Sequence, residues 1–351
     1  MTLRLVAGAS APPAGRYDAD VVILALDRME ETEQAIVSAL AQRGVSRHVT
    51  VVDQGSHPYA LDRLARRVAG RADASLWALS SNLGVAGGRD VGTWIGHGRV
   101  IAGIDNDAEF ADPDTLARAV AALDDDPGLA ALGLRIVEYD SGRDDLSSWG
   151  YPRRLLARAG EKFETATFVG AGHAIRRAAW DAAGDYDAKL FFCWEEYDFC
   201  LRAIALGWRI GYRGDIVVRH KVSAEHRVDW SGTRWFLFVR NRLYIERKWG
   251  ASWTTLAPRI AGYLVKGARA GLLRQTRFAI RAAARMDLAP RPLPAAAAAY
   301  LRRTDRAYRG TWLGRIRDEV LSMPGGGGSI SKAGGQRPMN ARIRGSAPWP
   351  C

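Results

Sequence analysis

The sequence contains few cysteines and no long apolar run, and each shortage excludes a class of protein. Cys193, Cys200 and Cys351 are too few and too unevenly spaced for a disulfide framework or a zinc site. No apolar run approaches the ~18 residues of a membrane span. Residues 1–17 lack the charged, apolar and cleavage regions of a signal peptide. We therefore expect a cytoplasmic protein, or one attached to the inner face of the cell membrane.

The net charge of +12 is distributed unevenly along the 351 residues. Residues 1–233 hold 27 Lys and Arg against 33 Asp and Glu, whereas residues 234–321 hold 19 against 5. The residues after 321 add four basic and no acidic side chains. A mildly acidic body thus carries a basic C-terminal extension, which would attract phosphate-rich surfaces, either anionic lipid or nucleic acid.

Strand and helix patterns alternate through the first half of the chain, with short joins between them. We expect strands at 21–26, 49–53, 75–79, 99–104, 130–137 and 215–220, and helices at 30–42, 61–68 and 116–123. A glycine-rich loop spans residues 82–89, and residues 140–164 read as an irregular loop over the site. This alternation predicts an α/β fold with a mostly parallel sheet, covered by helices on both faces. Ligands of such sheets bind at the carboxyl ends of the strands.

Asp105, Asn106 and Asp107 follow directly after the apolar strand at 99–104. Two carboxylates at the end of a strand supply the hard oxygen ligands that Mg²⁺ or Mn²⁺ prefers. The alternative is a simple turn, since Asp and Asn satisfy local backbone groups.

A second acidic group, Glu195, Glu196 and Asp198, falls in the first turn of a predicted helix. Carboxylates are favoured at a helix N-terminus on electrostatic grounds alone. The neighbouring aromatic residues would also desolvate a carboxylate and raise its proton affinity, as a general base requires. His220 ends a later strand, where it is either an ordinary core or surface residue or a further ligand.

Taken in order, these motifs resemble the family 2 glycosyltransferases of the GT-A fold, particularly the bacterial rhamnosyl- and galactofuranosyltransferase-like branch. The resemblance covers residues 20–250. It rests on these segments: Val51-Val52-Asp53-Gln54-Gly55-Ser56, residues 82–89, Ile104-Asp105-Asn106-Asp107, Gly170-Ala171-Gly172 with Arg176-Arg177, residues 194–202, and Val218-Arg219-His220.

The resemblance implies a role for each motif. Asp53 would read the nucleobase of a UDP- or dTDP-sugar, and Asn82 with Gly84 to Arg89 would wrap the nucleotide. Asp105 would face the ribose or a divalent cation, Mg²⁺ or Mn²⁺, and Asp107 would bind that cation. His220 would be a third contact, to the metal or to the diphosphate. Glu196 would be the catalytic base, supported by Glu195 and Asp198. An acceptor, either a glycan or a lipid-linked sugar, would lie against Gly170, Gly172, Trp194 and Glu195.

Two positions depart from the family pattern. The second acid of the helix motif is usually Asp, and Glu196 is longer by one methylene group. The first strand ends in Leu26-Asp27-Arg28 where a Thr-Tyr-Asn-like turn is usual. The implied activity is the inverting, metal-dependent transfer of a sugar to a hydroxyl group, in the synthesis of a cell-envelope or surface polysaccharide.

The predicted organisation is a flexible N-terminus at 1–17, a catalytic domain at 18–233, a basic helical extension at 234–323 and a disordered tail at 324–351. Between Arg259 and Arg285 the basic residues fall largely within one arc of a helical wheel. This pattern indicates either an interfacial helix on an anionic membrane or a basic face on helices that pack against the catalytic body.

Other functions are compatible with parts of the sequence. The basic extension suggests nucleic-acid binding, but the absence of a helix-turn-helix, zinc-finger or RNA-recognition signature argues against it. A sugar-nucleotide-binding protein without catalysis would keep the donor motifs. A nucleotidyltransferase would carry a basic glycine-rich loop after its first strand, and residues 26–30 do not supply one.

Overall fold

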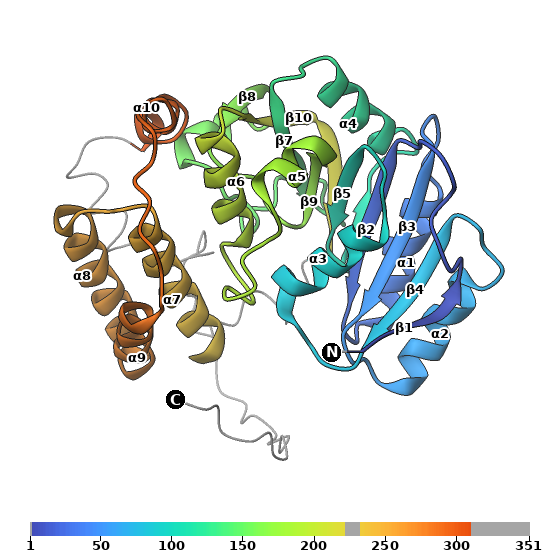
Figure 1. Ribbon diagram of the computed structural model, residues 1–351, viewed down its shortest axis with the longest axis horizontal. Coiled ribbons are helices and arrows are strands. Elements are labelled where there is room, and N and C mark those ends of the chain that lie inside the picture. The colour runs from blue at the N-terminus through green and yellow to red at the C-terminus, as the bar shows by residue number, and fades with distance from the viewer. Residues whose placement is uncertain (1, 222–231, 310–351) are drawn as a thin grey trace.

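A computed structural model describes residues 2–221 and 232–309. A mixed sheet lies at its centre, in the order β1-β4-β3-β2-β5-β9-β7-β10-β6, with β8 also paired to β10 (Figure 1). The strands are β1 (Leu3–Gly8), β2 (Ala19–Ala25), β3 (Arg47–Asp53), β4 (Ala74–Leu79), β5 (Val100–Ile104), β6 (Ala108–Phe110), β7 (Leu129–Glu138), β8 (Lys162–Thr165), β9 (Gly172–Arg176) and β10 (Arg209–His220).

Helices cover both faces of this sheet. They are α1 (Met29–Leu40), α2 (Pro58–Val68), α3 (Gly84–Ile95), α4 (Thr115–Asp124), α5 (Arg177–Ala183), α6 (Glu195–Ala205), α7 (Gly232–Lys248), α8 (Trp253–Arg269), α9 (Leu273–Arg285) and α10 (Ala295–Thr304), with short 3₁₀ turns at Arg153–Arg158 and Arg306–Tyr308. One apolar core lies between the strands and α1, α2 and α4. A second lies between the strands and α3, α5, α6 and α10. The predicted α/β layering is therefore confirmed.

The sheet is parallel on one side and mixed on the other. β4, β3, β2 and β5 run parallel, which places their carboxyl ends along one edge. β9 is antiparallel to both β5 and β7, and β6 is antiparallel to β10. The short β6 brings the chain that follows β5 alongside the end of β10, and this meeting of two strand ends creates the candidate site.

The N-terminus does not fit the prediction of a flexible segment. Residues Leu3–Gly8 form β1, which pairs antiparallel with β4 in a register of Leu3 to Leu79 and Leu5 to Trp77. The pairing satisfies the main-chain groups of an otherwise open sheet edge. The ordered body therefore begins before residue 18.

Two further segments are more regular than the sequence indicated. Most of the predicted glycine-rich loop belongs to α3, which begins at Gly84. The region 140–164 contains a 3₁₀ turn and most of β8, which pairs with β10.

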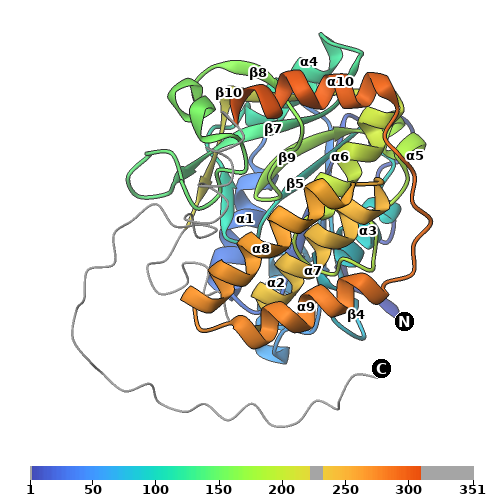
Figure 2. The same ribbon diagram turned by 90° about the vertical axis from the view of Figure 1, so that its left-hand side faces the viewer.

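Three helices of the C-terminal extension share a core of their own beside the sheet, while other residues of α7 (Tyr244, Ile245) and of α10 (Ala297, Tyr300, Leu301) belong to the second core of the sheet. Trp235, Val239, Leu243, Tyr263 and Ala279 belong to a core shared by α7, α8 and α9. Figure 2 shows these three helices together on one side of the molecule, with α10 crossing above them. None of the helices among the described residues is long and apolar enough to cross a bilayer.

The expected single interfacial helix between Arg259 and Arg285 is instead two helices, α8 and α9. The chain turns at Gly271, whose φ of 70° suits glycine. Lys266 is buried and Arg259 pairs with Glu246, so neither belongs to an exposed basic face. The predicted tail at 324–351 and residues 310–323 of the predicted extension lie outside the described residues. The boundary at 234 stays a prediction.

Candidate active site

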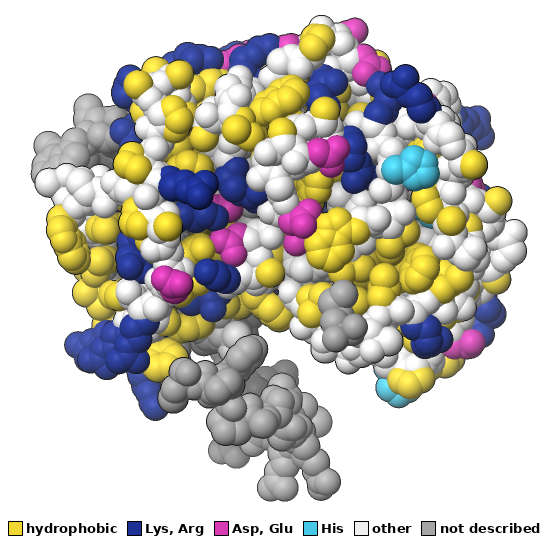
Figure 3. Space-filling view, in the orientation of Figure 1, with side chains coloured by type: hydrophobic (Ala, Val, Ile, Leu, Met, Phe, Trp, Pro, Cys, Tyr) yellow, Lys and Arg dark blue, Asp and Glu magenta, His cyan; other side chains and the backbone are white. Residues whose placement is uncertain are grey.

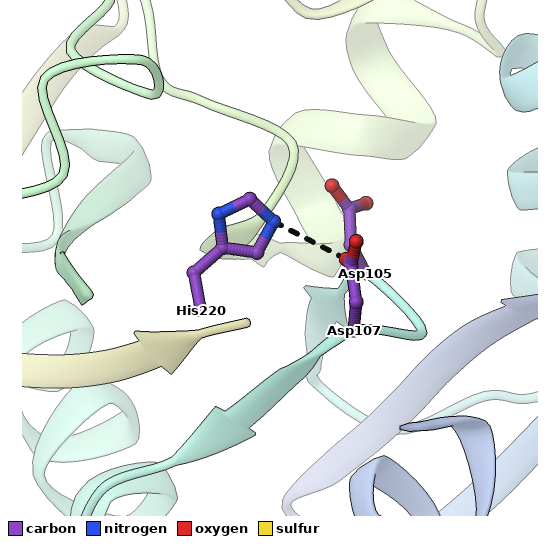
Figure 4. A group of neighbouring side chains, drawn as sticks. All are labelled: Asp105, Asp107 and His220. Atoms are coloured by element: carbon purple, nitrogen blue, oxygen red, sulfur yellow. Dashed lines mark hydrogen bonds and ion pairs between the residues drawn. The ribbon is translucent and has the colours of Figure 1, made fainter. Parts of the chain in front are cut away.

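Asp105, Asp107 and His220 lie together at the sheet edge (Figure 4). Asp105 ends the run of β5, and a turn in which the amide of Ala108 donates to the Asp105 carbonyl at 3.0 Å places Asp107 just before β6. In the antiparallel register of β6 and β10, His220 lies opposite Ala108. One ligand atom from each of the three side chains lies within 4.8 Å of the others.

His220 is held from both sides by carboxylates. Its Nδ1 lies 2.8 Å from Oδ2 of Asp145, and its Nε2 lies 3.2 Å from Oδ1 of Asp107. Burial would lower the pKa of His220, but the hydrogen bonds to these two carboxylates raise it to about 10. Asp145 is buried and also accepts from the hydroxyl groups of Ser147 and Ser148, and these bonds with the one from His220 outweigh burial and lower its pKa.

This arrangement fits a divalent cation. The two carboxylates supply the oxygen ligands that Mg²⁺ and Mn²⁺ prefer, and the imidazole nitrogen favours a transition-metal ion such as Mn²⁺ over Mg²⁺. A proton on Nδ1 of His220, donated to Asp145, would leave Nε2, which faces Asp107, as the ligand atom of a neutral imidazole, and this carboxylate–histidine arrangement is a common way to orient a metal-binding ring. Asp105, Asp107 and His220 are therefore the residues that would hold the ion.

Arg28 forms an ion pair with Oδ2 of Asp107. Burial would raise the pKa of Asp107, but His220 and the Arg28 guanidinium together lower it. Asp27 and Arg28 both have positive φ values, of 52° and 45°, and the carboxylate of Asp27 accepts from the amide of His57 at 3.1 Å. The loops after β2 and β3 are thus joined, and together they direct Arg28 toward the acidic site.

Arg89 lies between Asp105 and the candidate base, Glu196. It is only 3% exposed, and its Nη2 donates to Oδ1 of Asp105 and to the carbonyl oxygen of Gly170, both at 2.9 Å. A methyl group added at Gly170 would lie 2.3 Å from Oε1 of Glu196 and 3.6 Å from Nη2 of Arg89. Glu196 and Arg89 therefore both lie against Gly170, where a side chain would force Glu196 to move.

Glu196 has the proton affinity of a base that works near neutral pH. Burial raises its pKa to about 7, and the nearby Arg89 guanidinium opposes that shift. Glu195 is 2% exposed, and burial followed by the negative charge of Glu196 raises its pKa well above the usual range. Two neighbouring carboxyl groups with raised pKa values are typical of functional sites.

The other predicted residues have different surroundings. Asp53 is buried and accepts from the amides of Gly55 and Ser56 at 3.1 and 3.3 Å, and Asn82 accepts from the amide of Gly84 at 2.7 Å, so both order their own loops. Asn106 donates to Thr32 at 3.2 Å. Gly172 lies in β9, where an added methyl group would lie 3.0 Å from Val218.

Trp194 and Asp198 face α7 rather than the acidic site. The indole of Trp194 donates to the Phe238 carbonyl at 3.0 Å. Asp198 is fully buried, and its Oδ2 accepts from Arg202 at 3.1 Å and from Lys248 at 3.0 Å. These contacts favour a packing role for Asp198, whereas Glu196 lies beside the acidic site.

Sequence reasoning missed Arg28 and Asp145. Arg28 lies in the strand-end turn that departs from the family pattern, and this departure was a signal. Asp145 contacts His220 across 75 positions of the chain, and no local pattern marks it.

Comparisons with known proteins bear on the family and the fold. Residues 20–183 match the family model described as Glycosyl transferase family 2. A search of curated proteins finds no match. The matched range ends before Glu196 and His220, so it covers Asp105 and Asp107 but not the whole site.

Two solved glycosyltransferases share the architecture. The mannosyltransferase PcManGT from Pyrobaculum calidifontis, in complex with GDP-Man and Mn²⁺, is 18% identical with a TM-score of 0.52, over 89% of this chain and 87% of that one. GalNAc-T7 with UDP, GalNAc and Mn²⁺ is 15% identical with a TM-score of 0.54, over 76% of this chain and 55% of that one. The chain therefore has the GT-A fold that the sequence predicted, with a helical C-terminal extension. The rhamnosyl- and galactofuranosyltransferase-like branch stays a prediction.

Proposed function

We propose that this protein transfers a sugar from a nucleotide-diphosphate sugar to a hydroxyl group of an acceptor, with inversion at the anomeric carbon. The observation that carries the proposal is the joining of Asp105, Asp107 and His220 to Glu196 through Arg89 and Gly170. The family match and the two neighbours that contain nucleotides and Mn²⁺ support it.

The charge distribution suits such a reaction. A divalent cation held by Asp105, Asp107 and His220 would neutralise the negative charge of the diphosphate leaving group. Arg28 already lies against Asp107 and is 37% exposed, so it is placed to contact a phosphate oxygen. Asp53 and Asn82 shape the loops on the same sheet edge, where we place the UDP- or dTDP-sugar.

Glu196 removes the proton of the acceptor hydroxyl as that oxygen attacks the anomeric carbon. A carboxyl group with a pKa of about 7 is half ionised near neutral pH and binds the transferred proton well. A single displacement by the acceptor oxygen inverts the anomeric centre. Glu195 stays protonated beside it, which avoids two adjacent buried charges.

The acceptor is a glycan or a lipid-linked sugar of cell-envelope or surface polysaccharide synthesis. Four arginines, Arg274, Arg277, Arg281 and Arg285, lie exposed along one face of α9 with Phe278, which is 66% exposed. Figure 3 shows Lys and Arg side chains gathered over this part of the molecule. We place this face on the anionic inner surface of the cell membrane, which would make the protein a peripheral membrane enzyme.

Substitution of the base tests the reaction. Glu196→Gln should keep the thermal stabilisation by a nucleotide sugar with Mn²⁺ but lower turnover by about 10³-fold, because the proton acceptor is lost. Asp107→Asn should instead lose both the Mn²⁺-dependent stabilisation and the transfer. The assay compares hydrolysis and transfer across UDP- and dTDP-sugars, with and without Mn²⁺.

Full transfer by Glu196→Gln would reject Glu196 as the base. A wild-type protein that binds the sugar nucleotide but neither hydrolyses nor transfers it would instead be a binding protein without catalysis, the alternative that shares the donor motifs.

A further inference from the structure

The loop that leads into α6 has an unusual backbone. Phe191, Cys193 and Trp194 have φ values of 62°, 71° and 75°, the left-handed region that side chains other than glycine rarely adopt. Such conformations persist only when the surrounding structure enforces them, and they cluster at functional sites. The loop ends directly before Glu195 and Glu196, so its conformation sets where these carboxyl groups lie.

One side chain from α7 holds three carbonyl groups of this loop. Asn241 is fully buried, and its Nδ2 lies 2.8 Å from the carbonyl oxygen of Leu190, 2.9 Å from that of Phe192 and 3.0 Å from that of Cys193. The carbonyl groups converge on one amide nitrogen because the backbone between them is left-handed.

The neighbouring residue, Arg240, extends this contact. Its Nη2 donates to the carbonyl oxygens of Lys189 at 2.8 Å and Leu190 at 3.1 Å. Its Nε donates to Oδ1 of Asn241 at 2.8 Å, which fixes the orientation of the Asn241 amide so that Nδ2 faces the loop. Arg240 and Asn241 therefore act on the loop as one unit.

The opposite side of the loop rests on α3. The carbonyl oxygen of Phe191 accepts from the amides of Val85 and Ala86 at 2.7 and 3.3 Å, in the first turn of that helix. A methyl group at Gly84 would lie 2.1 Å from the same oxygen, so only glycine allows this approach. The loop is thus fixed between the helix that carries Arg89 and the helix that carries Asn241.

We propose that Arg240 and Asn241 form a clamp on the carbonyl groups of residues 189–193 that positions Glu196 for catalysis. The proposal rests on the proposed function for its kinetic consequence, while the geometry of the clamp is independent of it. It assigns α7, the first helix of the basic extension, a role in building the active site.

Two further bonds from α7, from Tyr244 to Asp187 at 2.8 Å and from Lys248 to Asp187 at 3.0 Å, continue the contact along one helix face.

Kinetics test the clamp with a control from the same helix. Asn241→Ala should lower kcat by about 10²-fold through misplacement of Glu196, with the KM for the sugar nucleotide and the Mn²⁺ affinity within about threefold of wild type. Arg240→Met should show the same split at about a tenfold loss. Arg247→Met is the control, because Arg247 also donates from α7 to main-chain carbonyls, but to those of Ala283 and Met286 in the extension.

A chemical probe tests the loop without any transfer assay. Cys193 lies within the clamped loop and is half-buried, and desolvation raises the pKa of its thiol well above the usual range, so it should react slowly with a maleimide. Labelling of the full chain, followed by mass spectrometry of the Cys193 peptide, should be about tenfold faster in Asn241→Ala and unchanged in Arg247→Met. Cys200, which is buried, serves as the internal reference for general unfolding.

The outcomes separate the two proposals. If the wild-type protein shows no transfer but Asn241→Ala exposes Cys193, the function is wrong and the clamp stands. The clamp proposal is overturned if Cys193 is labelled at the same rate in the wild-type protein and in Asn241→Ala. It is also overturned if Asn241→Ala lowers kcat and weakens donor binding by the same factor. If Asn241→Ala does not fold, Arg240→Met is the deciding variant, because Arg240 is only partly buried. An unchanged kcat together with an unchanged labelling rate of Cys193 in Arg240→Met refutes the clamp.

Discussion

The acidic site and the face of α9 hold their charges in opposite ways. Around the sheet edge almost every charged group has a partner: Asp107 contacts Arg28 and His220, Asp105 contacts Arg89, and Asp145 contacts His220. Arg274, Arg277, Arg281 and Arg285 are exposed on α9 and form no ion pair with another residue of the described ranges.

The difference follows from solvation. A buried charge without a partner costs far more than an exposed one, so charges near the sheet must be paired and are fixed in position by those pairs. Exposed arginines are hydrated, keep their freedom and contribute little to stability. Paired, fixed charges suit a reaction at defined atoms. Exposed arginines that keep their freedom suit attraction to an extended anionic surface. Three experiments test whether the two regions differ in this way.

The largest effect is expected from removing one buried charge. Asp198→Ala leaves Arg202 and Lys248 without their shared carboxylate and should lower the free energy of unfolding by about 3–5 kcal/mol. Arg281→Ala, on the exposed face of α9, should change it by no more than about 0.5 kcal/mol. Urea denaturation followed by fluorescence measures both, and equal effects would end the comparison.

A second, smaller effect concerns pH. Glu196 has a folded-state pKa of about 7 against an ordinary value of 4.5, so the folded state keeps a proton that the unfolded state loses between these values. Ionisation therefore destabilises the fold as the pH rises through this window, by roughly 3 kcal/mol at most.

Glu196→Gln removes that penalty, and its melting temperature should exceed that of wild type at pH 8 but match it near pH 4.5. Differential scanning fluorimetry without added metal provides the measurement. A constant difference across the pH range would show that Glu196 is not the group that titrates.

The smallest effect is expected at the α9 face. Each arginine near an anionic leaflet contributes about 1 kcal/mol, so Arg277→Glu with Arg281→Glu should weaken binding to phosphatidylglycerol vesicles by at least about tenfold. Arg66→Glu, at an exposed arginine on α2, is the control for one such charge change on a distant element, and Arg281→Glu alone is the variant compared with it. Vesicle sedimentation measures the loss of vesicle binding. An equal loss in the α9 variant and in the α2 control would contradict a membrane-facing role, and so would binding to RNA in place of vesicles.

Sequence reasoning located the acidic site because strand ends are readable from local patterns. Asp105 and Asp107 directly follow an apolar strand, His220 ends another, and parallel strands bring their carboxyl ends to one edge. The structure brings the three side chains together, while their role as metal ligands stays a prediction.

The supporting residues could not be read in the same way. Asn241 reaches the loop before α6 across about 50 positions, and Asp145 reaches His220 across 75. Such contacts depend on how helices pack, which local periodicity does not encode. The break between α8 and α9 depends on Gly271, a single residue whose left-handed backbone outweighs the continuous amphipathic pattern around it.

The pairing of β1 with β4 has a consequence for handling the protein. Without residues 3–8, the amide and carbonyl groups along the outer edge of β4 would be unpaired. They could then form hydrogen bonds with a strand of a neighbouring molecule. A truncated form that starts at the family-matched segment would then tend to self-associate through that edge. β1 takes over as the outermost strand, and its register shift between Leu5 and Ala7 makes it a poorer template for a neighbouring strand than β4 would be, at the end of the sheet far from the acidic site.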